Sequence, residues 1–139
     1  IFFIDFFSKN YVLSNFSENT FYVNNFINFD LTWNTGIGFG LFSSESNLIY
    51  NSISVLITLV IFFLLYLAIK SDNFDKINFS IIIGGALGNF YNRIFYKAVP
   101  DFIDLHYNNF HWFTFNIADI FITIGVILFI LKSFFEKNV

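Results

Sequence analysis

Apolar residues gather in three long runs that polar stretches separate. The runs cover residues 53–69, 77–96 and 115–135. Each would form a helix about 25–30 Å long, which suits a hydrocarbon core of about 30 Å. Lys70 ends the first run, and the third contains Asp119 near its start and Lys132 near its end. The pattern predicts three membrane-spanning helices.

A shorter apolar stretch, residues 1–13, contains Asp5 and Lys9. We interpret it as the outer half of a first span that is truncated at its N-terminus. The predicted fold class is therefore an all-α membrane protein. It would be a four-transmembrane-helix bundle that forms a single membrane-embedded domain over residues 1–139.

The polar segment 14–51 includes two stretches of strand-like composition, 21–23 and 29–33, so we expect a small extracytoplasmic β-structured loop region there. Residues 71–76 would link the second and third spans, and 97–114 the third and fourth. Basic residues set the expected orientation, because they favour the cytoplasmic side. This rule places Lys70, Lys76, Lys132 and Lys137 inside and the two long loops outside.

Composition agrees with a membrane protein and excludes several classes. Hydrophobic residues make up 56% of the chain and charged residues only 12%, against about 25% charged in a typical soluble domain. The net charge of −3 argues against nucleic-acid binding. Cysteine is absent, which excludes disulfides and thiolate catalysis. His106 and His111 lie in one loop and make a poor case for zinc, so we predict no metal and no cofactor.

Ionisable residues within predicted spans are costly and usually face the bundle interior or water. Asp5 and Lys9 are spaced i,i+4 and could neutralise each other, so a structural ion pair and a role in a site both stay open. Arg93 could snorkel to the interface, but Asn89 lies one turn before it and indicates a polar stripe. The GxxxG pattern from Gly84 to Gly88 favours close helix packing.

Two carboxylates stand out at the same predicted depth. Asp119 lies in the first turns of the last run with Asn116 at i−3, and Asp101 follows Pro100 just beyond the third run. Such a pair can share a proton, so that one carboxylate is a general base and the other a general acid. Asp104 rivals Asp101, and spacing alone also leaves structural or transport roles open.

Several motifs, in order, resemble those of lipoprotein signal peptidase (signal peptidase II). They are Asp5 with Ser8-Lys9, the loop Trp33 to Phe39 (WNTGIGF), Gly84 to Asn89 (GGALGN) followed by Asn92-Arg93, Val99 to Ile103 (VPDFI) and Phe115 to Asp119 (FNIAD). The resemblance covers nearly the whole chain. Departures are Asn92 in place of the family's Asp, and Ile37 and Gly38 in place of two alanines.

The resemblance implies an aspartic endopeptidase that removes the signal peptide before a diacylglyceryl-modified cysteine in prolipoproteins. It implies Asp101 and Asp119 as the catalytic pair, rather than Asp104, without a metal. The implied supporting residues around the substrate are Asp5, Lys9, Asn34, Gly36, Asn89, Arg93 and Asn116. The implied partners are the lipid-modified prolipoprotein, membrane lipids and globomycin-like inhibitors. The implied location is the bacterial inner membrane, with the active site on its periplasmic side.

Two other classes compete with a peptidase. A small transporter could use Asp119 and Arg93 as an ion relay, but the nearly uninterrupted apolar run from Ile120 to Leu131 argues against a polar path across the bilayer. A scaffold protein would not need two carboxylates at matched depth.

Overall fold

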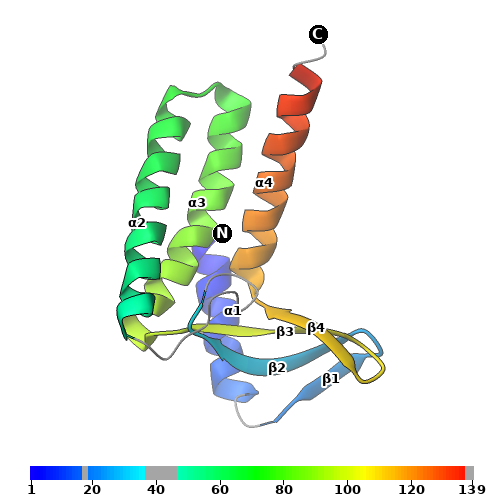
Figure 1. The fold of residues 1–139 in the computed structure, drawn as a ribbon. Helices are drawn as coiled ribbons and strands as arrows, with labels where there is room; N and C mark the ends of the chain where they lie inside the picture. The colour runs from blue at the N-terminus through cyan, green and yellow to red at the C-terminus, as the bar shows by residue number, and fades with distance from the viewer. Residues whose placement is uncertain (17–18, 37–46, 137–139) are drawn as a thin grey trace.

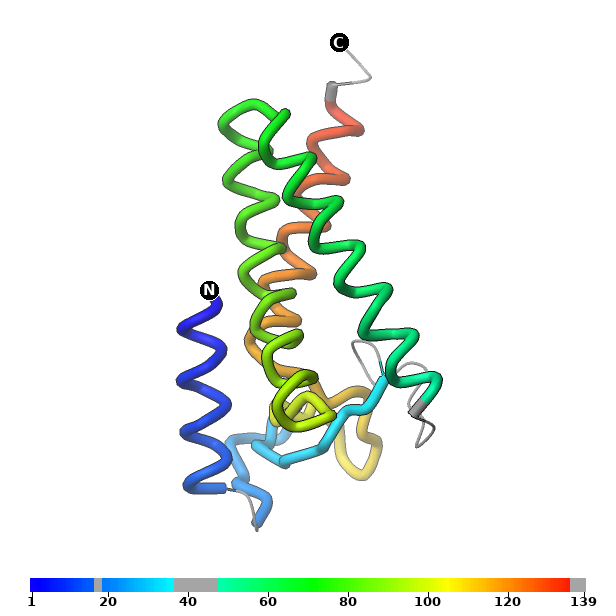
Figure 2. The backbone as a smooth tube through the Cα atoms, turned by 90° about the vertical axis from the view of Figure 1, so that its left-hand side faces the viewer, coloured from blue at the N-terminus to red at the C-terminus, as the bar shows by residue number. Residues whose placement is uncertain are grey.

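The computed structural model of the chain describes residues 1–16, 19–36 and 47–136. Its helices and strands are, in chain order, α1 (Phe2–Asn15), β1 (Phe21–Asn24), β2 (Ile27–Asn34), α2 (Asn47–Lys70), α3 (Asn73–Tyr96), β3 (Val99–Tyr107), β4 (Phe110–Phe115) and α4 (Ile117–Glu136). Figure 1 shows α2, α3 and α4 running alongside one another with the strands at one end. In Figure 2, α1 lies beside α3 and reaches the level of the strands.

The four strands form one antiparallel sheet in the order β1-β2-β3-β4. Strands β2 and β3 are distant in sequence but adjacent in the sheet, where Asn34 pairs with Val99 and Thr32 with Asp101. This pairing places the end of the first loop beside the residues that follow α3. The sheet thereby joins two segments that the sequence analysis treated as separate loops.

The predicted all-α, four-transmembrane-helix fold is wrong. A four-stranded sheet accompanies the helices, and the segment 97–114, expected to be only a connection, forms β3 and most of β4. The strands expected at 21–23 and 29–33 are confirmed, within β1 and β2. The physical reason is that these short segments satisfy their backbone hydrogen bonds by pairing with one another rather than by remaining in solvated loops.

Two of the described helices, rather than four, are long and apolar enough to be candidate membrane spans: Leu48–Lys70 and Ile117–Phe135. Only 17% of each apolar window is buried, whereas the core helix of a soluble protein is mostly buried, so their apolar surfaces face outward. The predicted spans at 1–13 and 77–96 are wrong. Helix α1 has 14 residues, about 21 Å, and polar residues dilute the apolar character of α3.

Helices pack most closely where glycine removes a side chain. A Cβ at Gly85 would lie 2.8 Å from the carbonyl oxygen of Ala118 in α4, and one at Gly88 would lie 2.5 Å from a carboxylate oxygen of Asp5 in α1. At the end away from the sheet, the buried core consists of Ala68, Phe79, Ile82 and Ile83. Helix α3 therefore contacts α1, α2 and α4, and it holds the polar residues of its other end between them.

Candidate active site

The start of α4 fixes Asp119 through a reciprocal pair of hydrogen bonds with Asn116. The side-chain oxygen of Asn116 accepts from the backbone N–H of Asp119 at 3.1 Å, and a carboxylate oxygen of Asp119 accepts from the backbone N–H of Asn116 at 3.2 Å. This is a capping box, in which each partner satisfies a free donor at the helix start. A local helix-start signal thus holds Asp119 in one orientation.

Asn116 also connects Asp119 to Asp101 on β3. Its side-chain amide donates to one carboxylate oxygen of Asp101 at 2.5 Å, and the amide of Asn34 donates to the other at 2.8 Å. Asp101 is only 2% exposed. Burial and the negative charge of Asp119 raise the pKa of Asp101 to about 7, although the two amide donors oppose that rise. Asp101 can therefore hold or release a proton near neutral pH.

A chain of polar contacts leads from Asp119 to α1. The side-chain amide of Asn89 donates to Asp119 at 2.8 Å, and its carbonyl oxygen accepts from the Lys9 ammonium at 2.7 Å. Lys9 in turn lies 2.7 Å from Asp5, and both are buried. The second oxygen of Asp5 accepts from the backbone N–H of Ala118 at 2.9 Å. The ion pair is thus also a clamp between α1 and the helix that carries Asp119.

Arg93, in the last turn of α3, is held by one backbone carbonyl. One of its guanidinium nitrogens donates to the carbonyl oxygen of Gly36. The Gly36 N–H donates to the Asn34 side chain at 2.8 Å, so the loop that positions Arg93 also positions an Asp101 partner. The remaining nitrogens of Arg93, Nε and Nη1, are buried without a hydrogen-bond partner among the described residues.

Asp119 borders two cavities. One, of about 320 Å³, lies between α2, α3 and α4; Asn89, Arg93 and Asp119 contribute to its lining, and most of its other lining residues, which include Leu56, Ile61 and Ile122, are apolar. The second, of about 270 Å³, lies where β3 and β4 meet α4 and is also largely apolar. A reacting group beside Asp119 would thus have apolar surface on both sides.

The described residues bring the nine predicted site positions into one connected cluster at the sheet end of the helices. Asp104, the rival of Asp101, lies apart from it and bonds to His111 at 2.7 Å. Arg93 bonds to Gly36, which lies in the Trp33–Phe39 loop. Residues 37–39 of that loop lie outside the described residues.

Comparisons with known proteins agree over the whole molecule. The family model for "Signal peptidase (SPase) II" matches residues 1–135. The chain belongs to the signal peptidase II family. A lipoprotein signal peptidase of Pelagibacter ubique is 56% identical over 117 residues, which are 84% of this chain and 70% of the relative. One from Wigglesworthia glossinidia brevipalpis is 40% identical over 141 residues, covering 99% and 92%.

A solved structure of a bacterial membrane enzyme, determined by the in meso method, aligns with a TM-score of 0.83 at 29% identity and covers 98% of this chain and 84% of that one. A second such structure aligns with a TM-score of 0.76 at the same identity. Membership of the signal peptidase II family makes the chain a peptidase, and the two outward-facing apolar helices fit a membrane enzyme.

Two contributors to the site were not predicted from the sequence. The Tyr50 hydroxyl donates to the carbonyl oxygen of Arg93 at 2.6 Å and so ties α2 to the end of α3. The backbone N–H of Ala118 binds Asp5. Tyr50 lies three residues before the apolar run 53–69, where an aromatic residue looks like an interface anchor. A backbone donor leaves no mark on sequence at all.

Proposed function

We propose that the chain removes the signal peptide from prolipoproteins whose cysteine bears a diacylglyceryl group, with water activated by Asp101 and Asp119. The observation that carries the proposal is the link between two buried carboxylates through Asn116. Removal of signal peptides from prolipoproteins follows from the family; the pair of aspartates and its place at the membrane interface are our proposal.

The pair would work with one shared proton. Asp101 holds it, since its raised pKa favours the protonated form near neutral pH, and Asp119 is the ionised partner. Asp119 takes a proton from water as the water oxygen attacks the scissile carbonyl carbon, while Asp101 donates a hydrogen bond to the carbonyl oxygen. Transfer of the proton from Asp119 to the leaving nitrogen then breaks the peptide C–N bond. The products are a carboxylate on the signal peptide and a free amine on the cysteine.

The surroundings of Asp119 suit a substrate that is both peptide and lipid. The apolar cavity between α2, α3 and α4 would accept apolar chains of the substrate. Arg93 contributes to the lining of that cavity, and its guanidinium would bind a backbone or ester oxygen of the substrate. Asp5, Lys9, Asn34, Gly36 and Asn89 would hold the reacting groups without touching the scissile bond.

We place the enzyme in the bacterial cytoplasmic membrane with the pair at its outer face. The sheet and the start of α4 lie at one end of the helices, whereas the α2–α3 link lies at the other (Figure 1). Asp101 belongs to β3 and Asp119 to the first turn of α4. At the end with the α2–α3 link, Lys132 bonds to Asp72 and Asp75. With Lys70 and Lys76 nearby in sequence, basic residues concentrate there, as expected for a cytoplasmic side.

The test uses purified protein in detergent and a synthetic prolipoprotein with a diacylglyceryl cysteine. We expect a shift to the smaller product on a gel, with a new N-terminus at the modified cysteine. The same peptide without lipid is the matched substrate control and should be cleaved far more slowly. A globomycin-like cyclic peptide should compete with the lipidated substrate. Cleavage at another bond, or equal cleavage of both peptides, would contradict the proposal.

A further inference from the structure

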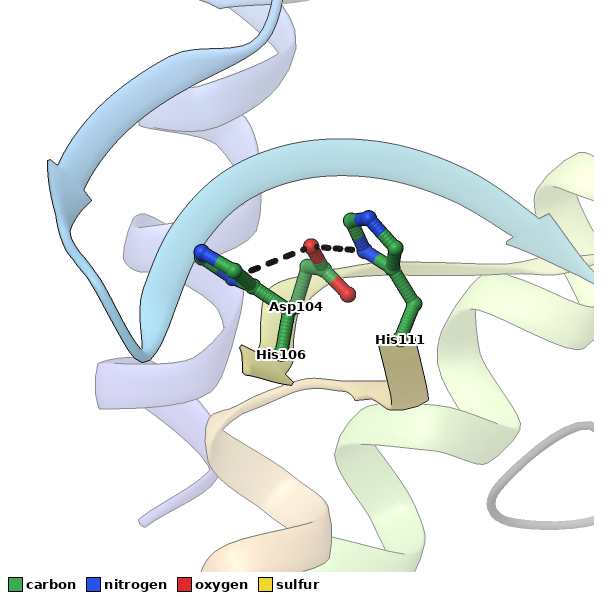
Figure 3. A group of neighbouring side chains, drawn as sticks. All are labelled: Asp104, His106 and His111. Carbon is green, nitrogen blue, oxygen red and sulfur yellow. Dashed lines mark hydrogen bonds and ion pairs between the residues drawn. The ribbon is translucent and has the colours of Figure 1, made fainter. Parts of the chain in front are cut away.

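Asp104, His106 and His111 form a second cluster of ionisable side chains, separate from the aspartate pair. A carboxylate oxygen of Asp104 lies 2.7 Å from Nδ1 of His111 and 3.6 Å from Nδ1 of His106. One donor atom from each residue falls within 4.8 Å of the other two. Figure 3 shows both rings turned toward the same oxygen of Asp104.

The register of the β3–β4 hairpin builds this cluster. Asp104 and His106 are two residues apart on β3, so they share a face of the sheet. His111 pairs directly with His106 and lies on that face too. Asp104 pairs with Thr114, so the register moves by one residue between the two pairs. An extra residue in β4 accounts for this shift, and such bulges re-aim side chains.

His106 carries the observation that points to a ligand. Its side chain is only 8% exposed, yet its Nδ1 has no hydrogen-bond partner among the described residues. A buried polar nitrogen without a partner is destabilising, and most such atoms in proteins are bonded. This nitrogen faces a carboxylate oxygen that is also buried, at a distance too long for a hydrogen bond. An ion bound to both atoms would give the His106 nitrogen the partner that it lacks among the described residues.

We propose that Asp104, His106 and His111 bind one Zn²⁺ through Oδ2 of the aspartate and Nδ1 of each histidine. In a tetrahedral site with bonds of about 2.0–2.1 Å, neighbouring ligand atoms are about 3.3 Å apart. The two separations from Asp104 Oδ2, 2.7 and 3.6 Å, bracket that value, and the three ligand atoms lie within 4.8 Å of one another, so side-chain rotations that close the cluster would complete the geometry. Two imidazoles and one carboxylate suit zinc, whereas Mg²⁺ and Ca²⁺ prefer oxygen ligands.

The ion would stabilise the hairpin rather than take part in peptide cleavage. The three ligands come from β3 and β4, and β4 leads through Asn116 into the helix that carries Asp119. Asp101 lies three residues before Asp104 and uses different partners, Asn34 and Asn116. Because His111 is exposed, water can fill the fourth coordination position. Zinc binding would therefore affect the stability of the protein more directly than the rate of peptide cleavage.

The experiment measures zinc binding by the full chain in detergent, after tag removal and treatment with a chelator. We expect one Zn²⁺ per chain by titration calorimetry and a higher melting temperature with Zn²⁺ but not with Mg²⁺. Asp104→Asn and His111→Gln should each weaken binding by more than about 100-fold, since even residues that only orient ligands are worth 10–100-fold. Asp30→Asn, which removes an exposed carboxylate from β2, is the matched control and should bind normally.

His111→Gln keeps the test decisive if Asp104→Asn fails to fold, because the His111 ring is more than half exposed. Tetrahedral Co²⁺ absorption, present in the wild type and lost in His111→Gln, would add support. The absence of saturable zinc binding would overturn the proposal. So would equal affinity in the wild type and His111→Gln, since the cluster would then be an Asp–His hydrogen bond with no ion.

Discussion

Asp101 and Asp104 lie on the same strand, three residues apart, and both are almost fully buried. Their surroundings differ in kind. Asp101 accepts from two asparagine amides and lies near a second carboxylate, whereas Asp104 faces two imidazoles. Residues three apart on a strand point to opposite faces, which explains how one short segment can serve two sites. Burial alone therefore does not identify a carboxylate as catalytic. The groups that surround the carboxylate distinguish the two aspartates.

The largest expected difference between Asp101 and Asp104 is in the effect of their substitution on the rate of peptide cleavage. Asp101→Asn and Asp119→Asn should each lower the cleavage rate by more than about 100-fold, because each removes a group that transfers a proton or polarises the carbonyl. Asp104→Asn should keep most activity when assayed without added metal. Cleavage of the lipidated peptide, with detergent melting to check folding, measures all three. An inactive Asp104→Asn beside an active Asp101→Asn would mean that the wrong carboxylate has been paired.

The dependence of the cleavage rate on pH also distinguishes Asp101 from the cluster around Asp104. Because burial and Asp119 raise the pKa of Asp101 to about 7, the proposed proton on Asp101 is lost as pH rises through that value. The rate should therefore fall about tenfold per pH unit on the alkaline side. His111→Gln, which changes the other cluster of ionisable side chains, is the control. It should leave the alkaline limb of the pH profile unmoved; a shifted limb would contradict the assignment of that limb to Asp101.

The prediction from sequence succeeded where the signal is local. The apolar runs of α2 and α4 stand out by composition, and both are candidate membrane spans in the structure. It failed where structure depends on pairing between distant segments: β2 joins β3 through contacts that no local pattern encodes. The histidines were weighed without Asp104, because the register that brings the three together is not readable from spacing.

A packing change of intermediate size tests whether the contact between α1 and α4 supports Asp119. Gly88→Ala would place a Cβ 2.5 Å from a carboxylate oxygen of Asp5, so it should push Asp5 away from Lys9 and Ala118. We expect a loss of about 1–3 kcal/mol in stability, together with reduced cleavage. Gly84→Ala is the matched control one turn earlier, because its nearest contact is the Ile1 side chain at 3.2 Å. Equal effects of the two changes on stability and cleavage would refute a special role for the Asp5 contact.

The smallest expected effect is at Asn92, where this chain differs from its family. Asn92 is 4% exposed, so a new carboxylate there would be destabilising by several kcal/mol unless it gains a partner. Arg93 offers one, since its Nε and Nη1 lack partners among the described residues. We therefore expect Asn92→Asp to keep cleavage activity and to change stability by no more than about 1 kcal/mol. Detergent melting and the cleavage assay on the same preparation measure both quantities.

A double-mutant cycle with Arg93→Gln tests whether the carboxylate introduced by Asn92→Asp pairs with Arg93 or is tolerated without such a pair. If the new carboxylate pairs with the guanidinium, Asn92→Asp should be much more destabilising in the Arg93→Gln background than in the wild type. Neighbouring residues on a helix do not face each other directly, so the pairing requires the guanidinium to turn back along α3 while it keeps its bond to Gly36. A marked loss of stability in the wild-type background, with no coupling to Arg93, would mean that the site is built around a neutral residue at position 92. The proposed role of Arg93 toward the substrate would then rest on its contact with Gly36 alone.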